Sequence, residues 1–387
     1  MEWKEVRLGD VCEIYGRIGF RGYTTNDLVD TPKEGAISLS PKNIINGELN
    51  LDQCTYIKWD KYYESPEIMI NPNEIIITKT GSSVGRTTFV RRVDHPMTLN
   101  PQLVVLKNIS ENAEFLSYNI KSALFQSVLK SIVVGSAIPT LSQKNLANLK
   151  INVPKEVDDQ RRIASILSSL DRKIELNNKI NADLEEMAQA IFKNWFVDFE
   201  PFKNGKFVDS ELGMIPEGWK VGCLGDLITI KYGKDHKKLD DGTFPVYGSA
   251  GLMRFVNSWL YNGESVLIPR KGTLDNIMYV CEKFWTVDTM FFSVPKMDYV
   301  MKYVYNYIKR FDFSKMNEGT SVPSNTAARL NKMPILIPTH EILEMYDETL
   351  CPIYNKRKMK DKESRILSLL RDTLLPRLMS GEIEVPE

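Results

Sequence analysis

The sequence predicts an α+β protein: two mixed α/β domains separated by two long antiparallel helices that form a coiled coil, with an internal pseudo-two-fold. Three observations predict this fold class. Residues 158–199 carry apolar side chains at alternating steps of four and three and contain no Pro or Gly, a spacing typical of a coiled-coil seam. The segments on either side alternate short strand-like runs with turn signals. Motifs of the first half also recur, in the same order, in the second half, as in proteins built from repeats.

The central helix is predicted over residues 156–200. Its apolar seam is narrower and longer than the buried face of an ordinary domain helix, although a long helix on the surface of one domain is the alternative. Asn177 and Asn181 interrupt the seam, and a polar residue there costs stability but fixes the pairing register. At about 1.5 Å per residue the helix would be roughly 60 Å long, so we expect it to space two domains apart. The seam positions are Ile163, Leu167, Leu170, Ile174, Leu184, Ala188, Ile191 and Trp195.

Residues 1–155 are predicted to form the first domain, with a substantial sheet. Turn signals such as Asn46–Gly47 separate its strand-like runs, and a stretch with helical spacing covers residues 114–130. The predicted strands are residues 35–39, 74–78, 86–90, 102–106 and 146–154.

Residues 201–338 are predicted to contain a linker and the second domain, and residues 339–387 a distal helix with a tail. Pro352 lies inside this helix and is expected to kink it or to end a turn, and the tail from Pro376 is expected to end it. The distal helix is more basic and less regular than the central one around residues 351–362, so we expect imperfect pairing there. Its seam positions are Leu367, Leu370 and Leu374.

The repeat between the two halves consists of three short motifs. Trp3–Lys4 with Leu8–Gly9–Asp10 recurs as Trp219–Lys220 with Leu224–Gly225–Asp226, residues 78–81 (TKTG) match 269–272 (PRKG), and residues 135–139 (GSAIP) match 319–323 (GTSVP). The last motif is followed after the same interval by Pro154 in one half and Pro338 in the other. Shared order and spacing argue against chance, and two copies of one unit suggest an internal two-fold, as in a fused homodimer.

The composition argues against several classes of protein. The 387 residues carry 50 Lys and Arg against 50 Asp and Glu, which disfavours a protein that coats nucleic acid nonspecifically but leaves room for a focused basic cleft. No apolar run is long enough to span a membrane, and residues 1–10 lack the apolar core of a secretory signal. Five scattered Cys without a Cys-x-x-Cys pair suggest reduced thiols in a cytoplasmic protein, and three isolated His argue against a metal site.

Three further motifs are long. Residues 159–180 (DQRRIASILSSLDRKIELNNKI) continue into residues 184–199 (LEEMAQAIFKNWFVDF), and the other two are residues 212–219 (LGMIPEGW) and 369–383 (LLRDTLLPRLMSGEI). In these motifs the chain resembles the specificity subunit of a Type I restriction-modification system. They are similar, in turn, to that family's central conserved region, to its entry into a target-recognition domain and to its distal conserved region. The resemblance covers the whole architecture.

This resemblance implies a noncatalytic, cytoplasmic DNA-recognition subunit. Each target-recognition domain would recognise one half of an asymmetric bipartite site, and the paired helices would act as a ruler for the spacer. Two modification subunits and the restriction subunits would dock on the helices. S-adenosylmethionine for methylation of adenine N6, ATP and Mg would then be bound by these partners, and no cofactor by this chain.

DNA-contacting residues are expected in two loops of each domain. Base recognition needs polar side chains at base edges, whereas phosphate binding needs cations and backbone N–H groups, and small residues let a phosphate approach closely. Ordinary solvated turns are the alternative, and Tyr15, Tyr23, Tyr232 and Tyr247 are interpreted as core rather than as base contacts. The candidates are Arg17, Arg21, Lys79, Ser82, Ser83, Arg86, Lys234, His236, Lys237, Lys238, Arg270, Lys271, Thr273 and Asn276, with Ser136 and residues 321–325 as weaker ones.

Signatures of catalysis are incomplete. No clear helix follows the glycines of residues 16–22, so the dinucleotide-binding fingerprint is not met. Residues 71–74 (NPNE) and 100–103 (NPQL) begin like the Asn-Pro-Pro-aromatic motif of adenine methyltransferases but lack the aromatic ring that would stack on a flipped base. Two alternatives stay open: a coiled-coil scaffold with two protein-binding heads and no DNA role, and a methyltransferase in its own right.

Overall fold

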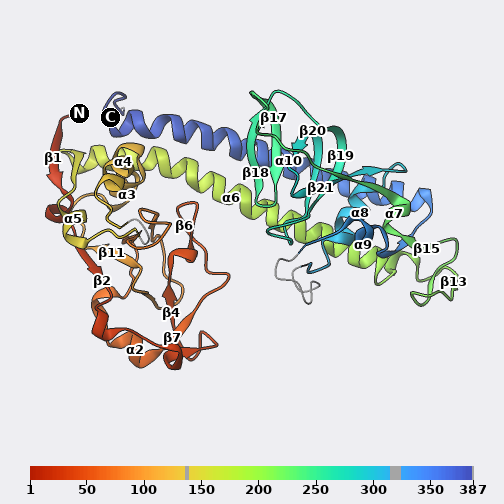
Figure 1. Cartoon of the computed structure of the whole chain (residues 1–387), viewed down its shortest axis with the longest axis horizontal. Coiled ribbons are helices and arrows are strands. Elements are labelled where there is room, and N and C mark those ends of the chain that lie inside the picture. Colours follow the sequence, from red (N-terminus) through yellow and green to blue (C-terminus); the bar gives the residue numbers. More distant parts are fainter. Residues whose placement is uncertain (136–138, 314–323, 386–387) are drawn as a thin grey trace. The chain divides into compact units, whose positions relative to one another are not determined.

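The computed structural model describes residues 1–135, 139–313 and 324–385 (Figure 1). The chain divides into two compact units: the first comprises Met1–Leu176 and Glu363–Glu387, and the second comprises Asn177–Lys362. Each unit contains one mixed α/β domain and one half of each of two long helices, which confirms the predicted fold class. None of the helices in the described ranges combines the length and the apolar character needed to cross a membrane.

The first domain is built on a sheet with the strand order β2-β11-β8-β9. Its elements are β1 (Trp3–Arg7), α1 (Leu8–Val11), β2 (Glu13–Gly16), β3 (Leu28–Val29), β4 (Gly35–Leu39), β5 (Ile44–Ile45), β6 (Glu48–Leu49), β7 (Tyr56–Lys58), α2 (Trp59–Tyr63), β8 (Ile75–Thr78), β9 (Thr87–Phe89), β10 (Met97–Leu99), β11 (Leu103–Lys107), α3 (Ala113–Lys121), α4 (Ala123–Ser131), α5 (Gln143–Ala147) and β12 (Lys150–Pro154). β11 pairs antiparallel with both β2 and β8, so that Val104 lies opposite Gly16 on one side and Ile77 on the other. A separate antiparallel pair, β1–β12, joins the start of the domain to its end, and a second sheet has the order β10-β4-β7-β3.

The second domain repeats this sheet. Its elements are β13 (Phe207–Val208), β14 (Ile215–Pro216), β15 (Lys220–Cys223), α7 (Leu224–Leu227), β16 (Ile228–Tyr232), β17 (Asp241–Gly248), β18 (Gly251–Val256), β19 (Tyr261–Pro269), β20 (Met278–Thr286), β21 (Met290–Pro295), α8 (Met301–Ile308), α9 (Ala327–Asn331) and β22 (Pro334–Ile337). The order β16-β21-β19-β20 matches β2-β11-β8-β9, and β17 and β18 extend it. β21 pairs antiparallel with β16 and β19, with Phe291 opposite Tyr232 and Ile268, and β15–β22 corresponds to β1–β12. The sequence repeat is therefore a repeat of topology and register.

The two long helices are α6 (Val157–Phe196) and α10 (His340–Met379). They pair antiparallel within each unit. In the first unit Lys173 lies 3.6 Å from Glu363, and in the second the Asn181 amide donates to Asp361 at 2.7 Å. Among the predicted seam residues, Ile163, Leu167, Asn177 and Ala188 are buried, and Leu170, Ile174, Leu184, Ile191, Trp195, Leu367 and Leu374 are half-buried.

Leu370 was wrongly placed in the seam, because its side chain is 45% exposed. The apolar face of this half of α10 instead uses Leu374 and Leu375 as partly buried neighbours of the first domain's core, with Leu378 fully inside it. Regular heptad spacing through Leu367, Leu374 and Leu378 places Arg371 rather than Leu370 at the inner position, and Arg371 pairs there with Asp171 at 2.7 Å.

The two prolines of the distal segment both lie inside one continuous helix. α10 runs through Pro352 without ending a turn there, and it ends at Met379, within the tail predicted to end it, before Gly381 with a φ of +75°. Pro costs one backbone hydrogen bond and a local clash in a helix interior, but Ile353 and Tyr354 beside Pro352 are buried in the second unit's core, and this packing outweighs the local cost.

Two other elements differ from the predictions. The predicted helix over residues 114–130 is two helices, α3 and α4, because the Ser122 side chain accepts the Phe125 N–H and starts a new helix. The strand predicted to begin at Leu146 starts at Lys150, since residues 143–147 form α5.

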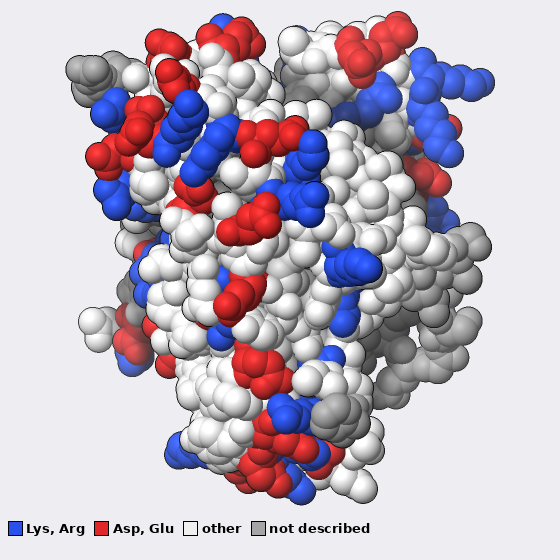
Figure 2. All heavy atoms as spheres, turned by 90° about the vertical axis from the view of Figure 1, so that its left-hand side faces the viewer, with Lys and Arg blue, Asp and Glu red and all other residues white. Residues whose placement is uncertain are grey.

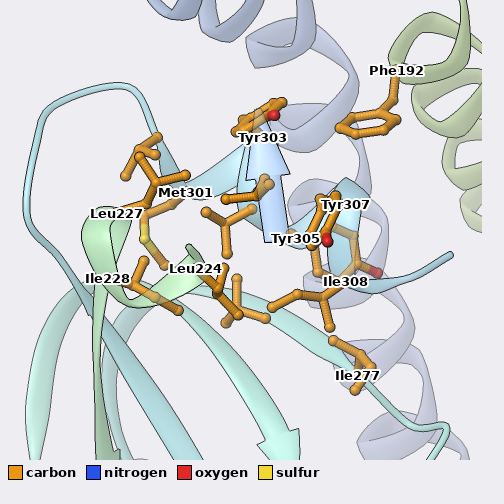
Figure 3. Packing of buried hydrophobic residues seen from close by; sticks show 14 of the residues in the cluster. Phe192, Leu224, Leu227, Ile228, Ile277, Met301, Tyr303, Tyr305, Tyr307 and Ile308 are labelled. Atoms are coloured by element: carbon orange, nitrogen blue, oxygen red, sulfur yellow. The ribbon is translucent and has the colours of Figure 1, made fainter. Parts of the chain in front are cut away.

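One continuous apolar core joins each domain to the helices of its own unit. In the second unit, Figure 3 shows side chains of α7, β16 and α8 gathered together with Phe192 of α6. Tyr303 of α8 stacks on Phe192 with ring centroids 5.6 Å apart. In the first unit Phe115 of α3, Leu167 of α6 and Leu378 of α10 share a core. Full burial of such a side chain contributes about 1.5–3 kcal/mol, so each domain is held firmly to its helix halves.

Candidate nucleic-acid interface

Two loops occupy the same place in the repeated sheet: residues 79–86 between β8 and β9, here the first hairpin loop, and residues 270–277 between β19 and β20, the second hairpin loop. Lys79 N donates to Gln102 O, and Leu141 N donates to Lys79 O, at 2.8 Å each. In the second unit Arg270 N donates to Thr289 O at 2.8 Å, and Asn325 N donates to Arg270 O at 3.0 Å. Lys79 and Arg270 are therefore equivalent positions, each fixed by backbone hydrogen bonds on both sides.

The first hairpin loop carries four predicted contacts close together. It is folded tightly, because Val84 N donates to Gly81 O at 3.1 Å and Arg86 N donates to Ser83 O at 3.0 Å. Gly81 has a φ of +103°, a backbone conformation that residues other than Gly rarely adopt. Ser82 and Arg86 are exposed, and Ser83 and Lys79 are half-buried. The loop thus places two cations and two hydroxyls on a stiff backbone.

Of these four residues, Lys79 is the strongest candidate for contact with an anionic ligand. Burial lowers the pKa of its ammonium group, and no carboxylate contributes to the shift. Within the described ranges neither Lys79 nor Arg86 forms an ion pair with a carboxylate. A partly desolvated cation without an anionic neighbour suits a phosphate, which would restore the lost solvation.

The loop of residues 16–25 differs from its prediction at Arg17. This side chain is only 5% exposed, and its guanidinium donates to Leu99 O at 2.8 Å, Thr98 Oγ1 at 3.1 Å and Arg21 O at 3.1 Å. Its donors point into the domain, so Arg17 supports the loop from inside, and the prediction of a DNA contact there is corrected. Arg21 keeps a partly exposed side chain, with its guanidinium 3.5 Å from Glu67.

The loop of residues 234–238 follows β16 in the second unit. Lys234, Lys237 and Lys238 are exposed, whereas His236 is half-buried. The backbone is anchored at its start, because Lys234 N donates to Thr286 O and the Trp285 indole donates to Lys234 O, at 2.9 Å each. Three lysines therefore project from a loop that is tied to the sheet.

The second hairpin loop carries the remaining candidates. Lys271 and Thr273 are exposed, but the Asn276 amide donates to Ser249 O at 2.9 Å and joins this loop to the turn between β17 and β18. The Arg270 guanidinium lies 5.5 Å from the centre of the Tyr232 ring. Tyr232 is 54% exposed, so its interpretation as core was wrong, whereas Tyr247 is buried as predicted.

Sequence reasoning missed one neighbour of the second hairpin loop, and some of the weaker candidates lie outside the described residues. Ser249 adjoins the second hairpin loop through Asn276, and no pattern in the sequence links residues so far apart. Ser136 and residues 321–323 lie outside the described residues, and Asn325 is buried, with its amide donating to Pro269 O at 2.9 Å. No group of three or more His, Cys, Asp or Glu in the described part of the chain is placed to hold a metal ion.

Basic side chains do not form one broad surface on the face shown in Figure 2, where blue and red residues are interspersed. A cavity of about 560 Å³ in the first unit is lined by Arg91, Arg161 and Arg172 together with Glu111 and Glu114. Its charges are largely balanced internally, since Arg91 pairs with Glu114 at 3.5 Å and Arg161 with Asp158 at 2.6 Å. The hairpin loops, rather than this cavity, are the stronger candidates for an anionic ligand.

Both halves of the chain are similar to known proteins. The family described as the Type I restriction modification DNA specificity domain matches residues 1–186 and 216–360. The MjaIX specificity subunit of Methanocaldococcus jannaschii is 26% identical over 426 residues, which cover 100% of this chain and 94% of the relative. The HindI specificity subunit of Haemophilus influenzae is 22% identical and covers 99% of this chain and 100% of its own length. The crystal structure of a Type I restriction-modification S subunit from M. genitalium shares the fold, with a TM-score of 0.55 at 18% identity over 97% of this chain and 96% of that one.

Proposed function

The chain belongs to the family of Type I restriction modification DNA specificity domains, and from this premise we propose that it is the sequence-specific DNA-binding subunit of a Type I restriction-modification complex. The observation that carries the proposal is the recurrence of one hairpin loop at the same place in both units, each with a cation held at its first residue. A protein with two equivalent binding loops suits a site made of two half-sites.

The two half-sites would differ in sequence. Equivalent positions in the two units carry different side chains: Lys79 corresponds to Arg270, and Gly16 corresponds to Tyr232. Because base recognition depends on the donor and acceptor pattern of each side chain, units that differ in this way favour an asymmetric bipartite site. The helices α6 and α10 would set the length of the spacer between its halves.

The same helices would dock the partner subunits. Large apolar side chains are exposed along α10, with Met359 at 67%, Ile366 at 57% and Leu369 at 70%. Met359 belongs to the second unit and the other two to the first, and exposed large apolar side chains on a helix with many charged residues favour a protein contact in each unit. We propose that two modification subunits, which methylate adenine N6, dock here, and that restriction subunits join them. S-adenosylmethionine, ATP and Mg would be bound by these cytoplasmic partners, and this chain would act without catalysis.

Binding measurements separate this proposal from its alternatives. Fluorescence anisotropy of the chain with its modification subunit, against a library of split DNA sequences, is expected to reveal one preferred bipartite site. A complex without any sequence preference would favour the scaffold alternative. Transfer of a methyl group by the isolated chain would instead favour a methyltransferase.

A further inference from the structure

The first position of the hairpin loop differs chemically between the units, with Lys79 in one and Arg270 in the other. We propose that this position determines base specificity and that Arg270, held on the ring of Tyr232, recognises a guanine in the half-site bound by the second unit. This inference rests on the proposed function and adds a specific base contact to it.

The strand register identifies what supports each cation. Gly16 lies opposite Val104, and Tyr232 lies opposite Phe291, at the same place in the repeated sheet. A Cβ on Gly16 would lie 2.6 Å from the amide nitrogen of Gln143, the first residue of α5. The corresponding first residue of α9 is the smaller Ala327. In the first unit the Gln143 side chain thus lies next to Gly16, which offers no aromatic ring to Lys79, whereas in the second unit Tyr232 offers one to Arg270.

Tyr232 gives Arg270 a fixed surface. Its ring meets the ring of Phe291 edge to face at 5.0 Å, and Phe291 is only 1% exposed, so the core fixes the position of the tyrosine. The guanidinium stands 5.5 Å from the tyrosine ring centre and donates one hydrogen bond, at 3.3 Å, to Asp288 O. The guanidinium is thus oriented by two contacts, and no carboxylate of the described chain forms an ion pair with it.

The chemistry of an oriented guanidinium points to guanine. Arg presents two parallel donors that match the O6 and N7 acceptors of guanine in the major groove. A ring beneath the guanidinium stabilises the cation and restricts its rotation, which lowers the entropic cost of that pairing. Lys79 offers a single flexible cation instead, which favours phosphate or a less selective base contact. The experiment must therefore distinguish the proposed guanine contact from a phosphate contact by Arg270.

The test uses the complete complex of this chain with its modification subunits and selects bound sequences from random duplex DNA. For Arg270→Lys, the preference for guanine at one position is expected to fall about 10-fold to 100-fold. Tyr232→Ala should reduce the same preference about 2-fold to 5-fold, and Tyr232→Phe, which keeps the ring, should restore it. The half-site of the first unit serves as the internal control in the same selection, and thermal melting shows that each variant is folded.

Two results would overturn the inference. A uniform loss of affinity for all sequences, with the guanine preference intact, would make Arg270 a phosphate contact. If Arg270→Lys changes the base preference at no position of the half-site bound by the second unit, Arg270 makes no base contact. A wild-type complex that selects no sequence would overturn the proposed function itself, which distinguishes the two failures.

Discussion

Lys79 is a half-buried cation whose ammonium pKa is lowered by burial. We expect Lys79→Met to weaken binding of the complex to all DNA sequences by a similar factor and to reduce the slope of log affinity against log salt by about one. Because only the protonated amine attracts phosphate, wild-type affinity should fall as the pH rises toward the lowered pKa. Lys79→Arg, whose guanidinium stays charged, should lose less affinity over the same alkaline range.

Anisotropy titrations over a salt series and a pH series check both effects. Lys150→Met is a suitable control, since Lys150 is an exposed lysine paired with Glu5 at 2.6 Å on β12, which pairs with β1 outside the sheet that carries the hairpin loop. An unchanged salt slope for Lys79→Met would show that Lys79 does not neutralise a phosphate.

For Arg17, in contrast to Lys79, we predict a loss of stability rather than a direct loss of DNA contact. Arg17→Met removes the donors to Leu99 O and Thr98 Oγ1 and leaves buried acceptors without partners, so the free energy of unfolding of the first unit should fall by about 2–4 kcal/mol. Urea denaturation followed by local hydrogen exchange measures this loss. A variant with full stability but weaker DNA binding would instead restore Arg17 as a DNA contact.

The sequence could suggest loops but not the orientation of each side chain in them. Arg17 lies among glycines and resembles a solvent-facing residue, yet two of its three acceptors lie about 80 positions away at residues 98 and 99. Tyr232 resembles a core residue because it ends a strand, yet its strand is at the edge of the sheet. Such long-range neighbours carry no local signal, which is why residue roles were less predictable than the loops themselves.

At the scale of elements, a tyrosine, a carboxylate and an arginine connect each domain to both long helices. In the first unit Asp171 of α6 accepts a hydrogen bond from Tyr118 at 2.6 Å and pairs with Arg371 of α10 at 2.7 Å. Burial and the hydrogen bond to Asp171 raise the pKa of Tyr118. In the second unit, Tyr305 donates to Glu185 at 3.0 Å, and Arg357 of α10 pairs with the same carboxylate.

Asp171→Ala is expected to destabilise the first unit by about 2–4 kcal/mol, because Arg371 and Tyr118 would lose their shared acceptor in a partly buried site. Asp171→Asn keeps an acceptor oxygen and should cost less. Hydrogen exchange is expected to accelerate in α3 but not in α8, which belongs to the other unit. Equal acceleration in both helices would mean that the cluster acts on the whole protein rather than on its own domain.

The long helices and the repeat were predictable because both are periodic along the chain. The seam of α6 recurs at coiled-coil spacing, and the Trp-Lys and Leu-Gly-Asp motifs mark the same strand and short helix in each domain. The exposure of Leu370 and the continuity of α10 through Pro352 depend on packing against residues from elsewhere in the chain. Periodicity predicts that a helix exists, whereas tertiary contacts decide which face it buries and where it ends.

At the scale of the whole molecule, the proposed function makes the helix pair a ruler. Insertion of seven residues after Asn181 in α6, with seven more beside its partner Asp361 in α10, preserves the heptad seam. The pair would lengthen by about 10 Å at 1.5 Å per residue, or about three base pairs at 3.4 Å each. Sequencing of methylated DNA from cells that carry this variant should therefore show a longer spacer between two unchanged half-sites. An unchanged spacer would show that the length of the helices does not set the spacer length. Altered half-sites would show that the helices also influence base recognition.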